Sequence, residues 1–382
     1  MRIRLRALAP LALWLLCPPL LAQDYVPPRD AWAEVAPSEA GFDPARLAAA
    51  VDWAREHGEQ APADLRDALV ASFGPREPGY RILGPVGTRG PGNGMILRGG
   101  RIVAEWGDTR RPEMTFSVAK STLSVVAGLA YDDGLLPDPG QRVASHVHGP
   151  WFEGAHNGAI TWTHLLQQTS DWSGTLWDIH DWADRPEGDD PANRPLHAPG
   201  TRYKYNDVRV NLLALALLEL QREPAPQVFK RRVMDPIGAS STWRWEGYGN
   251  SWITLDGLRM QSVSGGGHFG GGMVVNTRDL ARFGLLMQRD GVWAGRRLLS
   301  SEWIARSLTP SPVKPDYGYL WWLNTGRAAI PAAPEGAFWA AGFGGSQRTD
   351  GNNGLGSNDT RSSIYGTAVG VDYRFSPNTL AG

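Results

Sequence analysis

The chain has 382 residues, 42% of them hydrophobic, and its 38 basic and 39 acidic side chains nearly cancel. This length and apolar content suffice for a sizeable core, in one large domain or two interleaved ones. The lack of a basic surplus argues against a nucleic-acid partner, and a single cysteine, Cys17, excludes a disulfide framework.

The amino terminus has the pattern of a secretory signal peptide over residues 1–22. Three arginines precede an apolar run, and Ala22 suits a cleavage point. Cleavage would place the protein in the periplasm or outside the cell and would remove Cys17, leaving no thiol for catalysis or for a metal. A membrane anchor is the less favoured alternative, because the run is short and broken by prolines. Lipidation at Cys17 is another, disfavoured by the bulky Leu16.

The first elements after this segment are a helix and a pair of strands. A helix is predicted over 42–58, with Asp43 as N-cap and Pro44 at the first helical position. After a Pro- and Gly-rich loop, residues 95–98 and 101–106 predict two antiparallel strands joined by a two-glycine turn.

The next helix is predicted over 116–131, which contains no proline and has apolar residues at helical spacing. Ser117 lies in its first turn, and Lys120 follows on the same face, within reach of the Ser117 hydroxyl. A serine hydroxyl is a poor nucleophile unless a nearby base accepts its proton. A lysine serves as that base only where burial or neighbouring positive charge lowers its pKa. Taken alone, such a pair on a helix is more often two surface side chains than a catalytic pair.

The middle of the chain reads as largely helical. Helices are predicted over 161–168, 211–221 and 277–287, and a strand over 317–323. Helical material in the middle and strands toward both ends favour an α+β fold: an antiparallel sheet flanked by helices, with a helical lobe, roughly residues 125–260, inserted. Such an arrangement predicts a cleft between two lobes.

A second chemical element follows the turn at Pro199-Gly200. Tyr205, Asn206 and Asp207 stand just before the apolar helix that starts near Asn211. A tyrosine on such a loop can relay protons where cations stabilise its phenolate. The alternative is an aromatic side chain that only caps the core.

Together, these segments resemble the serine β-lactamase and penicillin-binding-protein superfamily, and within it the class C-like branch that includes carboxylesterases and 6-aminohexanoate-dimer hydrolases. The resemblance runs from about Trp32 to Gly345. The matching segments are Ser117-Val118-Ala119-Lys120 for Ser-x-x-Lys, Tyr205-Asn206-Asp207 for Tyr-x-Asn, and residues 160–170, 234–239 and 279–284.

The resemblance implies a β-lactamase/transpeptidase-like fold for residues 23–345 and hydrolysis through an acyl-enzyme. Ser117 would attack a small ester or amide, and Lys120 and Tyr205 would carry its proton to the leaving group. Backbone N–H groups of Ser117 and Phe343 would hold the oxyanion, with Gly342 beside them. It implies neither a cofactor nor a metal.

Two departures from the family pattern bear on substrate. Asp207 replaces the usual asparagine; it would either pair with Lys120 and raise the pKa of that amine, or face another cation. The third motif reads Ala340-Ala341-Gly342 and lacks the cation that helps β-lactamases and D,D-peptidases hold a substrate carboxylate. Esters and neutral-flanked amides are therefore the expected substrates, with a β-lactamase or D,D-peptidase as the alternative.

The segment 171–195 combines tryptophans with many carboxylates. It admits two interpretations. The one we favour is a solvated acidic loop whose tryptophans pack on the core. In the other, Trp172, Trp177 and Asp181 line an aromatic wall and an acidic rim that attract an ammonium-bearing substrate such as a 6-aminohexanoate oligomer.

Two further segments need an interpretation. The glycine-rich stretch 264–272 lacks the Lys-Ser/Thr of a nucleotide loop, so it predicts a close backbone approach, with His268 structural. Residues 346–382 depart from the family: a polar stretch precedes a segment, 365–375, with strand-like alternation. This tail is either chimeric or a replacement for a sheet strand. If the sheet is incomplete, a catalytically inactive binding protein is the competing hypothesis.

Overall fold

The structure, a computed structural model, describes residues 25–58 and 62–342, together with short strands between 347 and 381. The predicted signal peptide, Cys17 and Phe343 lie outside the described residues. Within the described part of the chain, no helix is both long enough and apolar enough to cross a membrane.

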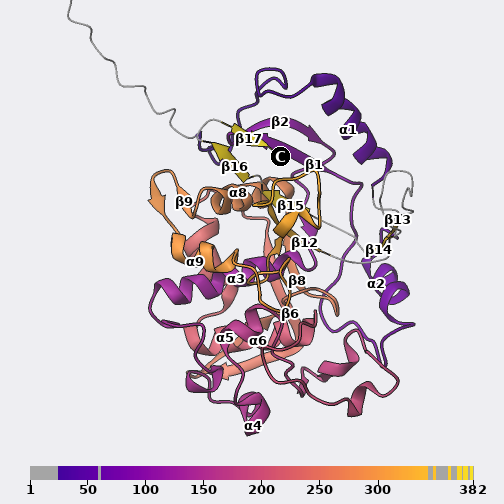
Figure 1. The fold of residues 1–382 in the computed structure, drawn as a ribbon, viewed down its shortest axis with the longest axis vertical. Helices are drawn as coiled ribbons and strands as arrows, with labels where there is room; N and C mark the ends of the chain where they lie inside the picture. The colour runs from indigo at the N-terminus through magenta and orange to yellow at the C-terminus, as the bar shows by residue number, and fades with distance from the viewer. Residues whose placement is uncertain are drawn as a thin grey trace, which may run out of the picture.

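The predicted first helix and hairpin are confirmed. Helix α1, Pro44–Glu56, is capped by the Asp43 carboxylate, which accepts hydrogen bonds from two backbone N–H groups. Strands β1, Gly94–Arg98, and β2, Arg101–Trp106, pair antiparallel. Gly99 and Gly100, between them, have φ of +55° and +81°, a left-handed pair that favours glycine in a two-residue hairpin turn. Figure 1 shows α1 and this hairpin together at one end of the molecule.

Helix α3, Val118–Asp132, is the central helix of the core. Its residues from Val118 to Ala130 are all buried, so the helix has no solvent face along most of its length. Gly128 permits this, because a Cβ there would lie 2.3 Å from the Trp303 ring. The Trp303 indole instead packs on the helix and donates to the Ser124 carbonyl at 3.0 Å.

Helix α6, Asp207–Gln221, starts four residues before the predicted 211–221. Its N-cap is Asn206, whose side chain accepts from the Arg209 N–H. The polar residues that hid this first turn from a hydrophobic pattern are there because they face a buried charged cluster, and α6 packs against α3. Other helices are α2 Leu65–Phe73, α4 Gly154–Asn157, α5 Trp162–Leu166, α7 Ala225–Phe229, α8 Thr277–Gln288 and α9 Ser301–Ser307.

Part of a four-stranded antiparallel sheet lies at the carboxyl end of the region, roughly 125–260, that was predicted to be helical, so that end of the prediction is wrong. Its order is β3-β8-β6-β7. The strands are β3 Glu113–Met114, β8 Gly272–Val275, β6 Arg244–Leu255 and β7 Leu258–Val263. Strands β6 and β7 were not predicted. Apolar residues such as Trp252 and Leu258 are exposed in the outer half of this hairpin, so the strands lack a regular alternation of apolar and polar positions.

A second sheet has the order β11-β12-β15. Strand β12, Phe338–Ala341, pairs with β11, Trp322–Leu323, and with β15, Ala368–Val371, so the carboxyl-terminal segment supplies a sheet strand by its backbone pairing. The predicted strand over 317–323 is wrong before Trp322, because Leu320 has a left-handed φ of +61°. The remaining short strands are β4 Thr175–Leu176, β5 Ile179–His180, β9 Val292–Trp293, β10 Arg296–Arg297, β13 Gln347–Thr349, β14 Thr360–Ser362, β16 Tyr373–Ser376 and β17 Thr379–Ala381.

Candidate active site

Ser117 stands at the start of the buried helix α3, where the chain turns sharply out of β3. It is 4% exposed and acts as the N-cap residue of the helix. Phe116, just before it, has a φ of +49°, a left-handed conformation that a non-glycine residue adopts only when its surroundings impose it. Gly342, after β12, packs against this turn so closely that a Cβ would lie 2.3 Å from the Thr115 carbonyl oxygen. The end of β12 therefore lies beside the serine.

Lys120 reaches back to the serine, as the spacing predicts. Its Nζ lies 2.8 Å from Ser117 Oγ and 2.5 Å from Asp207 Oδ1. Burial lowers the pKa of Lys120, and Arg185 acts in the same direction, whereas Asp207 opposes them; the net pKa is lowered. The structure thus gives the lysine the environment that a base requires.

Asp207 satisfies both alternatives left open by the sequence. One carboxylate oxygen contacts Lys120, and the same oxygen lies 3.6 Å from the Arg185 guanidinium. Burial alone would raise the pKa of Asp207, but Lys120 and Arg185 outweigh that effect and hold it low. Because Asp207 shares its charge between two cations, it does not cancel the effect of burial on the lysine.

Tyr205 lies next to this pair and retains some exposure to solvent. The Lys120 ammonium is 4.6 Å and the Arg185 guanidinium 5.1 Å from the centre of its ring. Its hydroxyl is hydrogen-bonded to the Ser117 side chain. Burial raises the pKa of the phenol above its ordinary value, and Asp207 adds to that, although Ser117 and Arg185 oppose it. Tyr205 is therefore a neutral phenol at physiological pH.

The glycine-rich stretch approaches this group, as predicted. A Cβ on Gly266 would lie 2.4 Å from Asp207 Oδ2 and 2.5 Å from Lys120 Nζ. Only a glycine lets the backbone cover the lysine–carboxylate pair without displacing it. The next polar side chain of the stretch, His268, is also buried.

In the 171–195 loop the tryptophans pack on the core, as the favoured interpretation expected, whereas the alternative of an aromatic wall and acidic rim is wrong for Trp172 and Asp181. Trp172 is 1% exposed and donates to the Trp151 carbonyl, and Asp181 is 1% exposed and pairs with Arg209 at 2.9 Å and Arg194 at 3.2 Å. Trp177 is partly buried against the core. Because buried arginines neutralise the carboxylate and the core holds the indole, Trp172 and Asp181 anchor the loop and have no free surface for a substrate.

Two side chains near the serine were missed by the sequence analysis. Trp322 stacks against Tyr205, with ring centroids 6.1 Å apart, and is partly exposed. Arg185 is 30% exposed at its side chain and lies over Tyr205. Neither belongs to a local motif, so only their nearness to Tyr205 in space reveals them.

The third motif keeps its glycine but has no cation. Ala340 and Ala341 are both buried in β12, which leaves only backbone groups and Gly342 at the edge of the site. The other predicted partner there, Phe343, lies outside the described residues.

Behind the lysine, three buried residues from distant segments meet. Glu77, Asp184 and His268 each offer a potential ligand atom, and these atoms lie within 4.8 Å of one another. Among the described residues, these three are of types that ligate metals and lie close enough together to hold one ion. Sequence spacing gave no sign of it, because the three residues are far apart along the chain.

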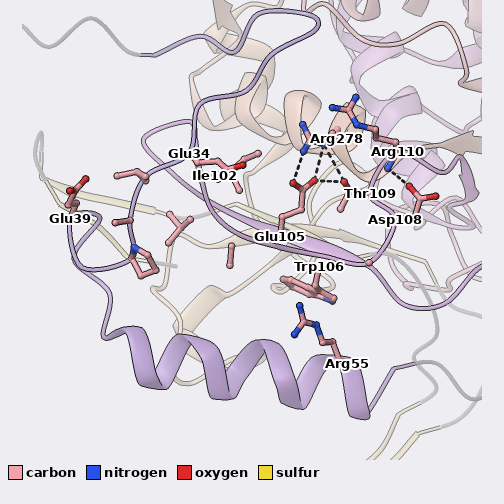
Figure 2. A pocket seen from close by; sticks show the side chains of 16 residues that line it. Glu34, Glu39, Arg55, Ile102, Glu105, Trp106, Asp108, Thr109, Arg110 and Arg278 are labelled. Atoms are coloured by element: carbon pink, nitrogen blue, oxygen red, sulfur yellow. Dashed lines mark hydrogen bonds and ion pairs between the residues drawn. The ribbon is translucent and has the colours of Figure 1, made fainter.

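A separate hollow of about 800 Å³ lies between α1 and β2 (Figure 2). Three of its polar side chains are paired with one another, since Arg278 donates to Glu105 and Thr109. It contains neither Ser117 nor Lys120, so chemistry and not size marks the candidate site.

A family model described as Beta-lactamase matches residues 95–356, well over half of the chain. The chain belongs to the Beta-lactamase family. The predicted α+β, β-lactamase/transpeptidase-like fold is thereby confirmed, and the prediction of a serine hydrolase is confirmed at the level of that class. The class C-like assignment stays a prediction.

Solved structures that resemble this member of the Beta-lactamase family include a penicillin-binding protein homolog from Caulobacter crescentus, with 16% identity, 81% of this chain and 94% of that chain covered, and a TM-score of 0.48. A family VIII carboxylesterase has 18% identity, coverage of 82% and 94%, and a TM-score of 0.46. A penicillin-binding protein from Bacillus halodurans has 19% identity, coverage of 72% and 89%, and a TM-score of 0.45. At these levels, substrate and mechanism rest on the chain's own residues.

Proposed function

We propose that this serine hydrolase forms an acyl-enzyme on Ser117 and cleaves small esters or neutral-flanked amides. The observation that carries the proposal is the contact of Ser117 Oγ with both a buried lysine amine and a tyrosine hydroxyl. A serine flanked in this way has a base on one side and a proton donor on the other.

In the acylation step, Ser117 Oγ bonds to the substrate carbonyl carbon while its proton passes to neutral Lys120. The lowered pKa of Lys120 makes the amine available for this. Tyr205, whose pKa is raised, donates its proton to the leaving alkoxide or amine as the bond between the carbonyl carbon and that group breaks. It then recovers a proton from Lys120.

Deacylation reverses these roles with water as the nucleophile. Water gives a proton to Lys120 and attacks the acyl carbon, and the Ser117 oxygen leaves with a proton returned from the lysine. The Ser117 N–H, at the amino end of α3, would stabilise the oxyanion, and the close approach of Gly342 to the Thr115–Phe116 turn would bring the backbone after β12 to the same place.

Two observations favour neutral esters over β-lactams and over ammonium-bearing oligomers. Ala340 and Ala341 offer no cation for a substrate carboxylate. Buried Asp171 and Asp181 are neutralised by Arg194 and Arg209 and present no charge to attract an ammonium.

The test compares Ser117→Ala with Ser124→Ala, a serine in the next turns of α3 whose hydroxyl makes no hydrogen bond within the described structure. Wild type and Ser124→Ala should hydrolyse a short-chain p-nitrophenyl ester and react with a fluorophosphonate, seen as an added mass on the intact protein. Ser117→Ala should do neither.

A folded wild-type protein that neither labels nor turns over the ester would refute the proposal in favour of a binding protein without activity. Nitrocefin turnover as fast as ester turnover would replace esters by β-lactams as the preferred substrates.

A further inference from the structure

His268 lies between two buried carboxylates. Its Nε2 is 2.8 Å from Glu77 Oε2, and its Nδ1 is 3.2 Å from Asp184 Oδ1. These contacts have ion-pair distances but not hydrogen-bond alignment, and only the imidazolium carries a positive charge and an N–H toward both carboxylates. The side chains of all three residues are at most 2% exposed, so water does not screen these charges.

The same three residues do not form a metal site in this arrangement. Glu77 and Asp184 contact different nitrogens of the ring, as they would around a doubly protonated imidazolium, whereas a ring that binds an ion gives it one lone pair. Arg185 Nη1 also lies 2.5 Å from the Asp184 oxygen that faces the ring. A cation at that oxygen would be repelled by the guanidinium.

The histidine is tied to the catalytic pair through two acidic residues. Asp184 accepts a hydrogen bond from the Asp207 N–H, which fixes the first residue of α6. The second carboxylate oxygen of Asp207 lies 3.6 Å from His268 Nδ1, while its first oxygen contacts Lys120. A change in the charge of the His268 ring therefore changes the electrostatic environment of Lys120, because the Asp207 carboxylate lies between them.

A protonated histidine reduces the net charge that surrounds a neutral Lys120 from two negative charges to one. Glu77, Asp184 and Asp207 supply three negative charges, and Arg185 supplies one fixed positive charge. Without the imidazolium, the two remaining negative charges would both act to keep Lys120 protonated.

The surroundings of the ring agree with a charged state. Burial and Arg185 would both lower the pKa of His268, yet Asp184 and Glu77 outweigh them and the pKa is raised. Phe73 and Phe269 contact the ring at centroid distances of 3.9 Å and 4.3 Å, and the Tyr80 hydroxyl donates to the His268 carbonyl. These contacts fix the ring between its two carboxylates.

Building on the proposed function, we propose that His268 is a positioning residue whose imidazolium offsets Asp207 and so keeps Lys120 available as the base. The histidine touches no substrate atom. It acts only by offsetting the negative charge of Asp207, which otherwise favours the protonated form of Lys120.

The experiment measures the pH dependence of kcat/KM and of the fluorophosphonate labelling rate in His268→Gln. Loss of the positive charge should move the acidic limb of both profiles upward by roughly one pH unit, which is about a tenfold loss of rate at a pH below the limb. His146→Gln, a partly buried ring that accepts from the Trp162 indole, is the matched control and should keep the wild-type profile.

Charge rescue separates this role from packing. In Glu77→Gln/His268→Gln, one negative and one positive charge disappear together, and the amide oxygen can still accept from the Arg185 N–H as Glu77 Oε1 does. The double variant should move the limb back toward wild type, although it packs no better than the single one. A limb that stays shifted would show a structural role and overturn the proposal.

Two other outcomes would also overturn it. An unchanged pH profile in folded His268→Gln would overturn the role of the histidine. If Ser117-dependent labelling persists in that variant, the proposed function still holds. A gain of wild-type thermal stability on addition of Zn²⁺, lost in His268→Gln, would show a metal site in place of the imidazolium. If Ser117→Ala labels like wild type, the proposed function itself fails.

Discussion

Two buried charged clusters lie close together in this protein and differ in one respect. The first, called the catalytic cluster after its proposed role, contains Glu77, Lys120, Asp184, Arg185, Asp207 and His268. The second, the loop cluster, contains Asp171, Asp181, Arg194 and Arg209, in which each arginine contacts both carboxylates. Both are made of acids and bases from distant segments, but only the first includes a lysine and a histidine.

Because of that difference, we expect the first cluster to act in proton transfer and the second to act only in stability. Arginine stays charged at any physiological pH, so the loop cluster has fixed charges and can only hold the 171–195 loop to α6. Lysine and histidine change charge when burial and neighbours move their pKa, so the catalytic cluster can exchange protons. The variants below test whether the two clusters divide activity and stability in this way.

The largest effect is expected from Lys120→Met, which removes the base and roughly keeps the volume. The ester hydrolysis rate should fall by roughly 10²- to 10⁴-fold, the usual contribution of a general base. Steady-state kinetics on the folded variant measure it. A loss of less than a few-fold would show that the catalytic cluster does not supply the base.

Arg209→Met tests the loop cluster and should act on stability. It leaves Asp171 and Asp181 with Arg194 alone, and breaking such a buried pair costs about 3–5 kcal/mol of unfolding free energy. Denaturant titration measures this, with Arg222→Met, from an exposed ion pair, as the control that should barely move the midpoint. If Arg209→Met abolished kcat in folded protein without changing stability, the contrast between the clusters would be wrong.

The smallest effect is expected from Asp207→Asn, which restores the family's amide. Because Asp207 raises the pKa of Lys120 against burial, its neutralisation should lower that pKa further. The acidic limb of the rate profile should then move to lower pH, opposite in sign to His268→Gln. The pKa of Asp207 is depressed in the fold, so its stabilising contribution is present above the ordinary carboxyl pKa and lost as pH falls through the lowered value. Wild type should therefore lose more stability than the variant on acidification.

Features that depend only on neighbouring residues could be predicted from the sequence. The Ser117 and Lys120 pair lies within one helical turn, and the capped helix at Asp43 and the two-glycine hairpin turn depend on neighbouring residues only. The family match over residues 95–356 covers all the segments on which the resemblance was based.

Prediction failed where a residue's role depends on what reaches it from elsewhere. Trp172 packs on the core, as the favoured interpretation of the 171–195 loop expected, but Asp181, expected in solvent or at a binding rim, is buried against two arginines. Trp322 lies in a strand, as expected, but its stacking on Tyr205 joins two distant segments and has no signal in either one.

The sequence by itself predicted the family and the pair that we propose as nucleophile and base, because a helix repeats every few residues and puts Ser117 and Lys120 on one face. Only the tertiary structure decided the charge state in which they work. Glu77, Asp184 and His268 meet behind Lys120 through long-range packing, and buried charges interact strongly enough there to set which groups hold protons.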